Sequence, residues 1–220
     1  MKTVFKRLIS LSFVLALVLS MLLLSSCAID FRNKVEKRFD KILTSDSYTV
    51  VASYDDGSSY EIRLMNGAIY YITDYDGVRT TAYLFRDEEQ GKYYHYYTTD
   101  DGETDEKPKN KEELTEAEYV MTFVSLESAM GFSQYAFQYR QILDMADNDD
   151  GVYKYSTVSN SGASSYRNIY TIKPTDNGIE FTHEMTGKGV EEENTIEITG
   201  INDTEFTIPA EVYSMEVTEK

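Results

Sequence analysis

The chain has 220 residues, a single cysteine and a formal net charge of −17, which arises from 38 acidic and 21 basic side chains. One cysteine excludes an intrachain disulfide and a thiolate-bound zinc or iron–sulfur site. A strongly acidic surface repels phosphate backbones, so nucleic acid is excluded as an expected partner. The length suffices for one domain with its own core, which therefore needs no disulfide for stability.

Residues 1–26 have the pattern of a secretory signal peptide, with three early basic residues and then the uncharged run Leu8 to Leu24. The sequence "LSSC" at 24–27 resembles the lipobox of bacterial lipoproteins, in which cleavage falls just before the cysteine. The resemblance implies a lipid-modified Cys27 as the first mature residue, and an extracytoplasmic protein that is anchored to the cell membrane. An uncleaved helix remains the alternative, although the run is at the short end of what spans a bilayer.

The mature chain begins with a helical pattern and continues with strands. Apolar residues recur at helical spacing over residues 30–44, which predicts an amphipathic helix. Asp-Gly and Asn-Gly turn signals then recur, and the segments between them are rich in Tyr, Val, Ile and Thr. This pattern predicts a β-meander of five strands, at 47–55, 59–65, 68–74, 78–86 and 92–99.

A polar segment and a helical pair follow. Residues 100–113 contain no apolar side chain, and a mobile acidic loop is expected there. Thr115 and Glu118 form a capping-box pattern for a helix that reaches Met130. This helix is apolar nearly all round, so we expect it to be well buried. A second helix follows, with one face formed by Tyr135, Tyr139, Ile142 and Ala146.

Strand patterns return at 152–159, 165–173, 178–185, 194–199 and 204–208. The order of elements predicts one mature α+β domain over residues 27–220. Its strongly curved antiparallel β-sheet, a half-barrel of about nine or ten strands, would carry the N-terminal helix and the helical pair on one face.

This order resembles the LolA-like family of lipoprotein and lipid carriers, in which helices inserted at mid-chain cover a half-barrel sheet. The closing segment "IEITGINDTEFTIPAEV", residues 196–212, resembles the last strand pair of such proteins. The resemblance implies a carrier that holds an apolar ligand between its sheet and its helices.

No motif of known chemistry is present. The Asp-Gly turns lack the acidic residues that an EF-hand loop requires at its first position, so turns are expected and not calcium sites. His95 and His183 lie far apart in sequence, and His183 on an apolar strand face is expected to be a satisfied core residue rather than a ligand. No nucleophile motif or phosphate-binding motif occurs, so we expect that the protein is not an enzyme and has no catalytic residue. We also expect that it binds no metal ion and no cofactor. Paired-carboxylate catalysis remains open.

Tyrosine is abundant, with 19 residues and clusters such as "YYHYY" at 93–97. Such clusters suit a platform for sugar rings or an aromatic-lined cavity. They equally suit ordinary half-buried strand surfaces. Since both faces of strand 93–97 are aromatic, at least one aromatic row is expected away from the main core.

The sequence thus supports two hypotheses. The first is a non-enzymatic, membrane-anchored lipoprotein that binds a lipid or lipid-linked segment between sheet and helices. Its predicted ligand-binding residues are Tyr135, Tyr139, Ile142, Ile179, Phe181, Met185, Ile196 and Ile198. The second is an envelope interaction module that docks a protein or glycan partner through its Tyr-rich strands.

Overall fold

The computed structural model describes residues 34–102, 107–149, 151–161 and 164–218. Cys27 and the segment before it lie outside the described residues, so the signal-peptide and lipidation hypotheses stay predictions.

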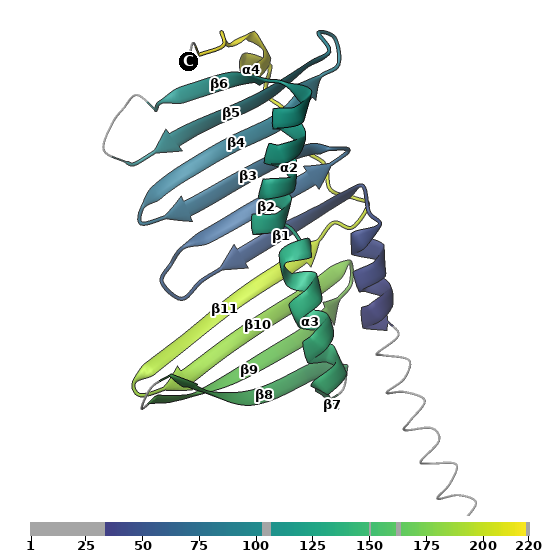
Figure 1. Cartoon of the computed structure of the whole chain (residues 1–220), viewed down its shortest axis with the longest axis vertical. Coiled ribbons are helices and arrows are strands. Elements are labelled where there is room, and N and C mark those ends of the chain that lie inside the picture. Colours follow the sequence, from purple (N-terminus) through teal and green to yellow (C-terminus); the bar gives the residue numbers. More distant parts are fainter. Residues whose placement is uncertain (1–33, 103–106, 150, 162–163, 219–220) are drawn as a thin grey trace, which may run out of the picture.

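Eleven antiparallel strands form one open sheet in the order β6-β5-β4-β3-β2-β1-β11-β10-β9-β8-β7 (Figure 1). The first half contains β1 (Ser47–Ser53), β2 (Ser59–Met65), β3 (Ala68–Tyr75), β4 (Val78–Asp87), β5 (Lys92–Asp100) and β6 (Lys109–Leu114). The second half contains β7 (Asp147–Asp149), β8 (Val152–Ser161), β9 (Ser164–Thr175), β10 (Gly178–Gly187) and β11 (Val190–Thr199).

The path of the chain explains this order. From the centre, β1 to β6 meander outward to one edge of the sheet. Helices α2 (Glu116–Met130) and α3 (Ser133–Met145) then cross the sheet to the opposite edge (Figure 1). Strands β7 to β11 return to the centre, where β11 pairs with β1 and places Ile198 opposite Val50.

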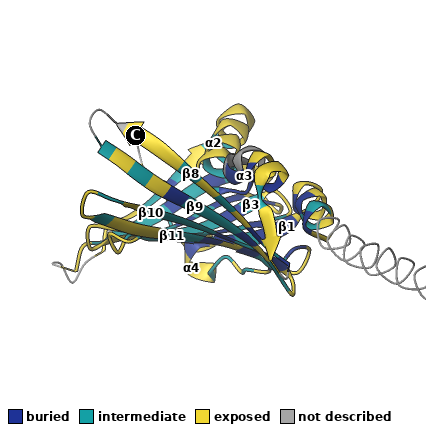
Figure 2. Cartoon of the chain, turned by 90° about the horizontal axis from the view of Figure 1, so that it is seen from below, coloured by how far each residue is buried: buried dark blue, intermediate teal, exposed yellow. Residues whose placement is uncertain are grey.

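The helices divide between the two faces. Residues 34–43 are helical (the N-terminal helix), and with α2 and α3 they cover one face, called the inner face. The short helix α4 (Ala210–Ser214) lies against the other, outer face (Figure 2). The expected α+β class, with an antiparallel sheet and these three helices on one face, is therefore confirmed.

The main core lies between the inner face, the N-terminal helix and α3. Because strand side chains alternate between faces, every second residue of β1, β2, β10 and β11 points into it. The ring of Phe39 lies 5.8 Å from that of Phe181 and 5.4 Å from that of Phe132, measured between centroids. Each such fully buried side chain contributes roughly 1.5–3 kcal/mol to stability.

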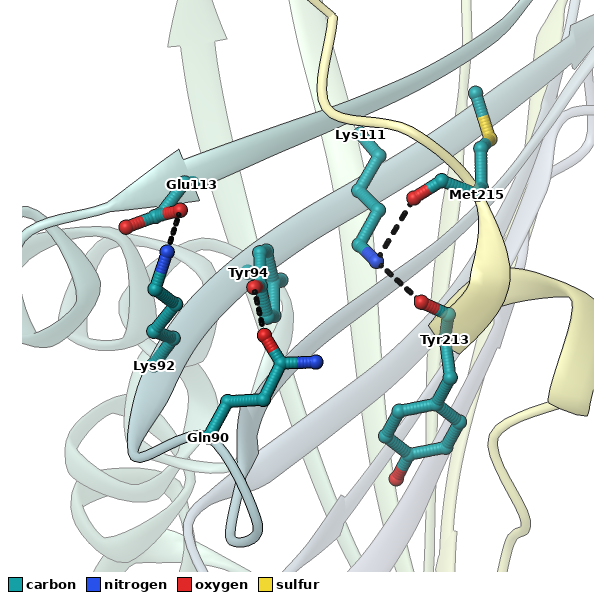
Figure 3. A network of polar contacts seen from close by, with 7 residues as sticks. All are labelled: Gln90, Lys92, Tyr94, Lys111, Glu113, Tyr213 and Met215. Carbon is teal, nitrogen blue, oxygen red and sulfur yellow. Dashed lines mark hydrogen bonds and ion pairs between the residues drawn. The ribbon is translucent and has the colours of Figure 1, made fainter.

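A second, smaller core lies on the outer face. Phe85, Tyr94 and Tyr96 are buried there beneath Val212 of α4. The side chain of Lys111 on β6 is also buried, and its Nζ donates to the carbonyls of Tyr213 (2.8 Å) and Met215 (3.1 Å), as Figure 3 shows. The C-terminal segment is thus held across β4, β5 and β6.

This arrangement bears on the expected aromatic rows of "YYHYY". Tyr94 and Tyr96 point to the outer face and are buried there, while Tyr93, His95 and Tyr97 point to the inner face and are only half-buried. The buried row therefore belongs to the smaller core.

Three predictions about elements are wrong. Residues 109–113, expected within the mobile loop at 100–113, belong to β6. An edge strand needs little apolar surface, and Lys111 supplies packing through its aliphatic stem. Strand β7 was not predicted. Residues 204–208 do not form a strand. The ring centroids of Phe206 and Tyr70 lie 6.0 Å apart, so this segment packs its apolar side chains on the outer face and its backbone does not pair with a neighbouring strand.

The prediction that α2 is well buried is also wrong. All 15 residues of α2 are described, and none is buried. The capping box of Thr115 and Glu118 is present, so the start of the helix is as predicted. The error lies in reading an apolar composition as burial on all sides, whereas one apolar side of α2 faces solvent.

Candidate functional site

The predicted ligand-binding residues do come together on the inner face. Seven of the eight are buried in the main core, and Met185 lies half-buried further along β10. The ring of Tyr139 stacks on that of Phe181 at 3.9 Å between centroids, so α3 and β10 are in direct contact. These side chains fill the space between the helix and the sheet, and their binding role stays a prediction.

A pocket of about 310 Å³ lies beside this core, between the N-terminal helix, the β1–β2–β3 region and α2. Three segments that are far apart in sequence form this pocket, so no local sequence pattern predicts it. Its apolar lining consists of Ile42, Leu43, Tyr48, Leu64, Phe123 and Phe132, and its polar lining of Ser45, Asp46, Asn66 and Glu127 with the backbone of Gly67. An apolar lining with a few polar groups suits one end of an amphipathic ligand.

Tyr48 connects the pocket to both α2 and the start of α3. Its hydroxyl donates to Glu127 Oε1 at 3.0 Å and accepts from the Phe132 N–H at 3.4 Å. Burial, followed by the negative charge of Glu127, raises the pKa of Tyr48 well above its usual value. Tyr48 is therefore a neutral donor at physiological pH, and it holds the C-terminal end of α2 against the sheet.

The apolar side chains of α2 are only partly covered by the sheet. Its sheet-facing side chains Tyr119, Phe123, Leu126 and Met130 are only half-buried. Its solvent side exposes Val120 (53%), Met121 (71%) and Val124 (55%).

Near its N-terminal end, α2 is held by Tyr119. The Tyr119 hydroxyl donates to the carbonyl of Gly67, and the Tyr119 ring lies 4.7 Å from that of Tyr93. Burial raises the pKa of Tyr119 to about 12, so this donor also stays neutral at physiological pH. Tyr119 and Tyr48 therefore pin α2 by two hydroxyl contacts, on a helix whose apolar side chains are only half-buried.

Two aromatic rows extend the inner face beyond the helices. In one row, the ring of His95 lies 6.4 Å from Tyr71 and 5.4 Å from Tyr97. Burial lowers the pKa of His95, which is therefore predominantly neutral at pH 7.

The second row is formed by Tyr155, Tyr170 and His183. The ring of Tyr170 stacks on His183 at 4.5 Å and lies 6.3 Å from Tyr155. The His183 Nε2–H donates to Asn168 Oδ1 at 3.0 Å, and burial lowers the pKa of this imidazole. His183 thus has a hydrogen-bond partner, as the sequence predicted, but it lies half-buried at the margin of the core and not within it.

The acidic turns are built by local hydrogen bonds. Asp56 Oδ1 accepts from the N–H of Ser58 at 2.8 Å, and the hydrogen bonds from Ser58 lower the pKa of Asp56. Gly57 follows with a φ of 83°, as such a turn requires. Among the described residues, no group of three or more His, Cys, Asp or Glu side chains is placed to hold a metal ion.

Within the described part of the chain, no helix has both the length and the apolar character needed to cross a membrane. No protein-family model, curated protein or solved structure matches the chain. Any function is therefore inferred from the sequence and from the geometry of the inner face.

Proposed function

We propose that the mature chain is an extracytoplasmic lipoprotein, anchored through Cys27, that binds the apolar chain of a lipid or lipid-linked molecule between the inner face and α2. It would act as a non-enzymatic binding protein. The observation that carries the proposal is that α2 lies over the sheet although none of its own residues is buried. An apolar-lined pocket of about 310 Å³ lies beside it. The lipobox-like sequence at 24–27 supports a site of action next to a bilayer.

Packing energetics favour a mobile α2 over a mobile α3. Moving α3 would separate the stacked rings of Tyr139 and Phe181 and expose a filled core. Moving α2 would expose side chains that are already half in water, and it would break the hydroxyl contacts of Tyr48 and Tyr119. Each such contact contributes about 0.5–3 kcal/mol.

Ligand size leads to the same conclusion. The pocket is at the lower end of the volumes typical of small-molecule sites, so a whole acyl chain requires α2 to move outward. Each CH₂ group that leaves water contributes ~0.8 kcal/mol, and a chain of several such groups offsets the lost contacts. The half-barrel curvature and the resemblance to LolA-like carriers belong to the same proposal. The insertion of α2 and α3 between the two halves of the sheet supports them.

A matched pair of variants on α2 tests the proposal. Phe123 lines the pocket, whereas the adjacent Val124 is exposed to solvent. We expect the Ala28–Lys220 domain to bind a fluorescent fatty acid, Phe123→Glu to abolish binding, and Val124→Glu to retain it. Loss of binding in both variants, or in neither, would place the ligand elsewhere.

The second candidate function, docking of a protein or glycan, is favoured by the half-buried rows around His95 and His183. Half-buried aromatic rings on a sheet still present part of each ring to a sugar or to a partner's side chains. If Tyr97→Ala and Tyr155→Ala abolish binding to a glycan array while the wild-type domain binds no fatty acid, this candidate replaces the first.

A further inference from the structure

The N-terminal helix has one basic side whose side chains are exposed. Val35, Phe39 and Ile42 are buried against the sheet, while Lys34, Lys37 and Lys41 are exposed. At 100° per residue, the three lysines fall within about 60° of arc on the helix surface. Figure 1 shows this helix at the margin of the helical layer, beside α2 and α3.

The other charged side chains of the helix lie to either side of the lysine arc. Glu36, at 100° per residue, falls about 100° from Lys37. Asp40 forms an ion pair with Arg140 of α3. Arg38 donates to the carbonyl of Gly178 at 2.7 Å, at the start of β10. The charges that face outward over the lysine arc are therefore positive.

This basic side stands out against the remainder of the chain. Residues 27–44 contain five Lys or Arg and three Asp or Glu, whereas residues 45–220 contain 13 and 35. Near an anionic surface, the body is repelled and the N-terminal helix is attracted. Such a distribution turns the domain so that the helix faces the surface.

We propose that the face formed by Lys34, Lys37 and Lys41 binds the anionic headgroups of the membrane to which the chain is anchored. This inference rests on the proposed anchoring at Cys27. Six residues lie between Cys27 and Lys34, so the seven steps along the chain span at most ~25 Å when fully extended. The tether therefore allows the helix to touch the bilayer, where each lysine gains attraction over roughly one Debye length of ~8 Å.

Amine labelling of the full lipidated protein tests this surface. The protein is reconstituted in vesicles of phosphatidylcholine, alone or with about one third phosphatidylglycerol, and acetylation of each lysine is followed by mass spectrometry. We expect Lys37 and Lys41 to react roughly fivefold more slowly on the anionic vesicles, as about 1 kcal/mol per lysine implies. High salt should abolish the difference. Lys109 starts β6, and Lys188 lies in the turn between β10 and β11; both are exposed. These strand ends lie away from the N-terminal helix (Figure 1), so the two lysines should react equally on both kinds of vesicle.

Two variants with equal charge change serve as controls. In the double variant Lys37→Gln and Lys41→Gln, the remaining Lys34 should lose its protection. In Lys109→Gln with Lys188→Gln, the protection of Lys34 should persist. Equal labelling of Lys37 and Lys41 on both kinds of vesicle, or equal slowing at Lys188, would overturn the inference.

Anchoring is read separately, so that the two proposals fail in different ways. The wild-type protein should float with pure phosphatidylcholine vesicles, and Cys27→Ser should not. Absence of flotation contradicts the anchor, whereas flotation without protection of Lys37 and Lys41 contradicts only the headgroup surface. If flotation fails, labelling in excess anionic vesicles still decides whether the lysine face binds them.

Discussion

Replacing Phe181 with alanine should be among the most destabilising single changes in the domain. Its side chain is fully buried, and its ring stacks on Tyr139 at 3.9 Å and lies 5.8 Å from Phe39. The change removes a large apolar group from water-excluded packing and leaves a cavity between α3, the N-terminal helix and β10. A loss of about 3–5 kcal/mol in the free energy of unfolding is expected.

The matched change is Phe123→Ala on α2, where the ring is only half-buried. Its expected cost is about 1 kcal/mol, because water already reaches much of this side chain. Urea unfolding of the Ala28–Lys220 domain, followed by far-ultraviolet circular dichroism, measures both. If Phe181→Ala costs no more than Phe123→Ala, the space beneath α3 is not filled, and the ligand site lies there instead of beneath α2.

Three further predictions concern the outer face, the imidazoles and a close backbone approach. Lys111→Ala removes the donor that holds the C-terminal segment, so the free energy of unfolding should fall by about 2 kcal/mol. Residues 210–218 should then become sensitive to limited proteolysis, and an unchanged cleavage pattern would contradict this role. Burial lowers the pKa of His183, so protonation favours the unfolded chain as pH falls below ~6.5; the stability of His183→Gln should fall less steeply than that of wild type between about pH 7 and 5, and parallel profiles would refute this. In Gly178→Ala the new Cβ would lie 1.6 Å from the Ile198 carbonyl oxygen, so a loss above ~3 kcal/mol in the free energy of unfolding is expected. Gly57→Ala, where the Cβ meets open space but φ is positive, should cost roughly 1–2 kcal/mol. Similar melting temperatures for the two variants would show that β10 and β11 separate easily.

The strands that the sequence predicted well are those bounded by turn chemistry. Gly57, Gly67 and Gly77 all adopt positive φ, so each Asp-Gly or Asn-Gly signal marks a real reversal of the chain. The missed strand β6 has no such pattern, because its packing comes from the stem of Lys111 beneath the C-terminal segment. That contact joins residues far apart in sequence, and no periodicity within residues 109–114 reveals it.

The candidate site was predicted only in part, for a related reason. The apolar face of α3 and the strand face of β10 follow from periodicity, and the structure brings them together as a core. The pocket depends on where the N-terminal helix, the end of β2 and α2 meet, which local patterns do not determine. The sequence does show that α2 is apolar nearly all round. The structure adds that none of its residues is buried and that Val120, Met121 and Val124 face solvent.

Native mass spectrometry of the Ala28–Lys220 domain, incubated with total membrane lipid, tests the central claim most directly. We predict a bound species of lipid mass that persists in Val124→Glu and disappears in Phe123→Glu, with both variants folded by circular dichroism. A bare protein mass in the presence of excess lipid would contradict the claim. The half-buried tyrosine rows would then remain as the binding surface to examine.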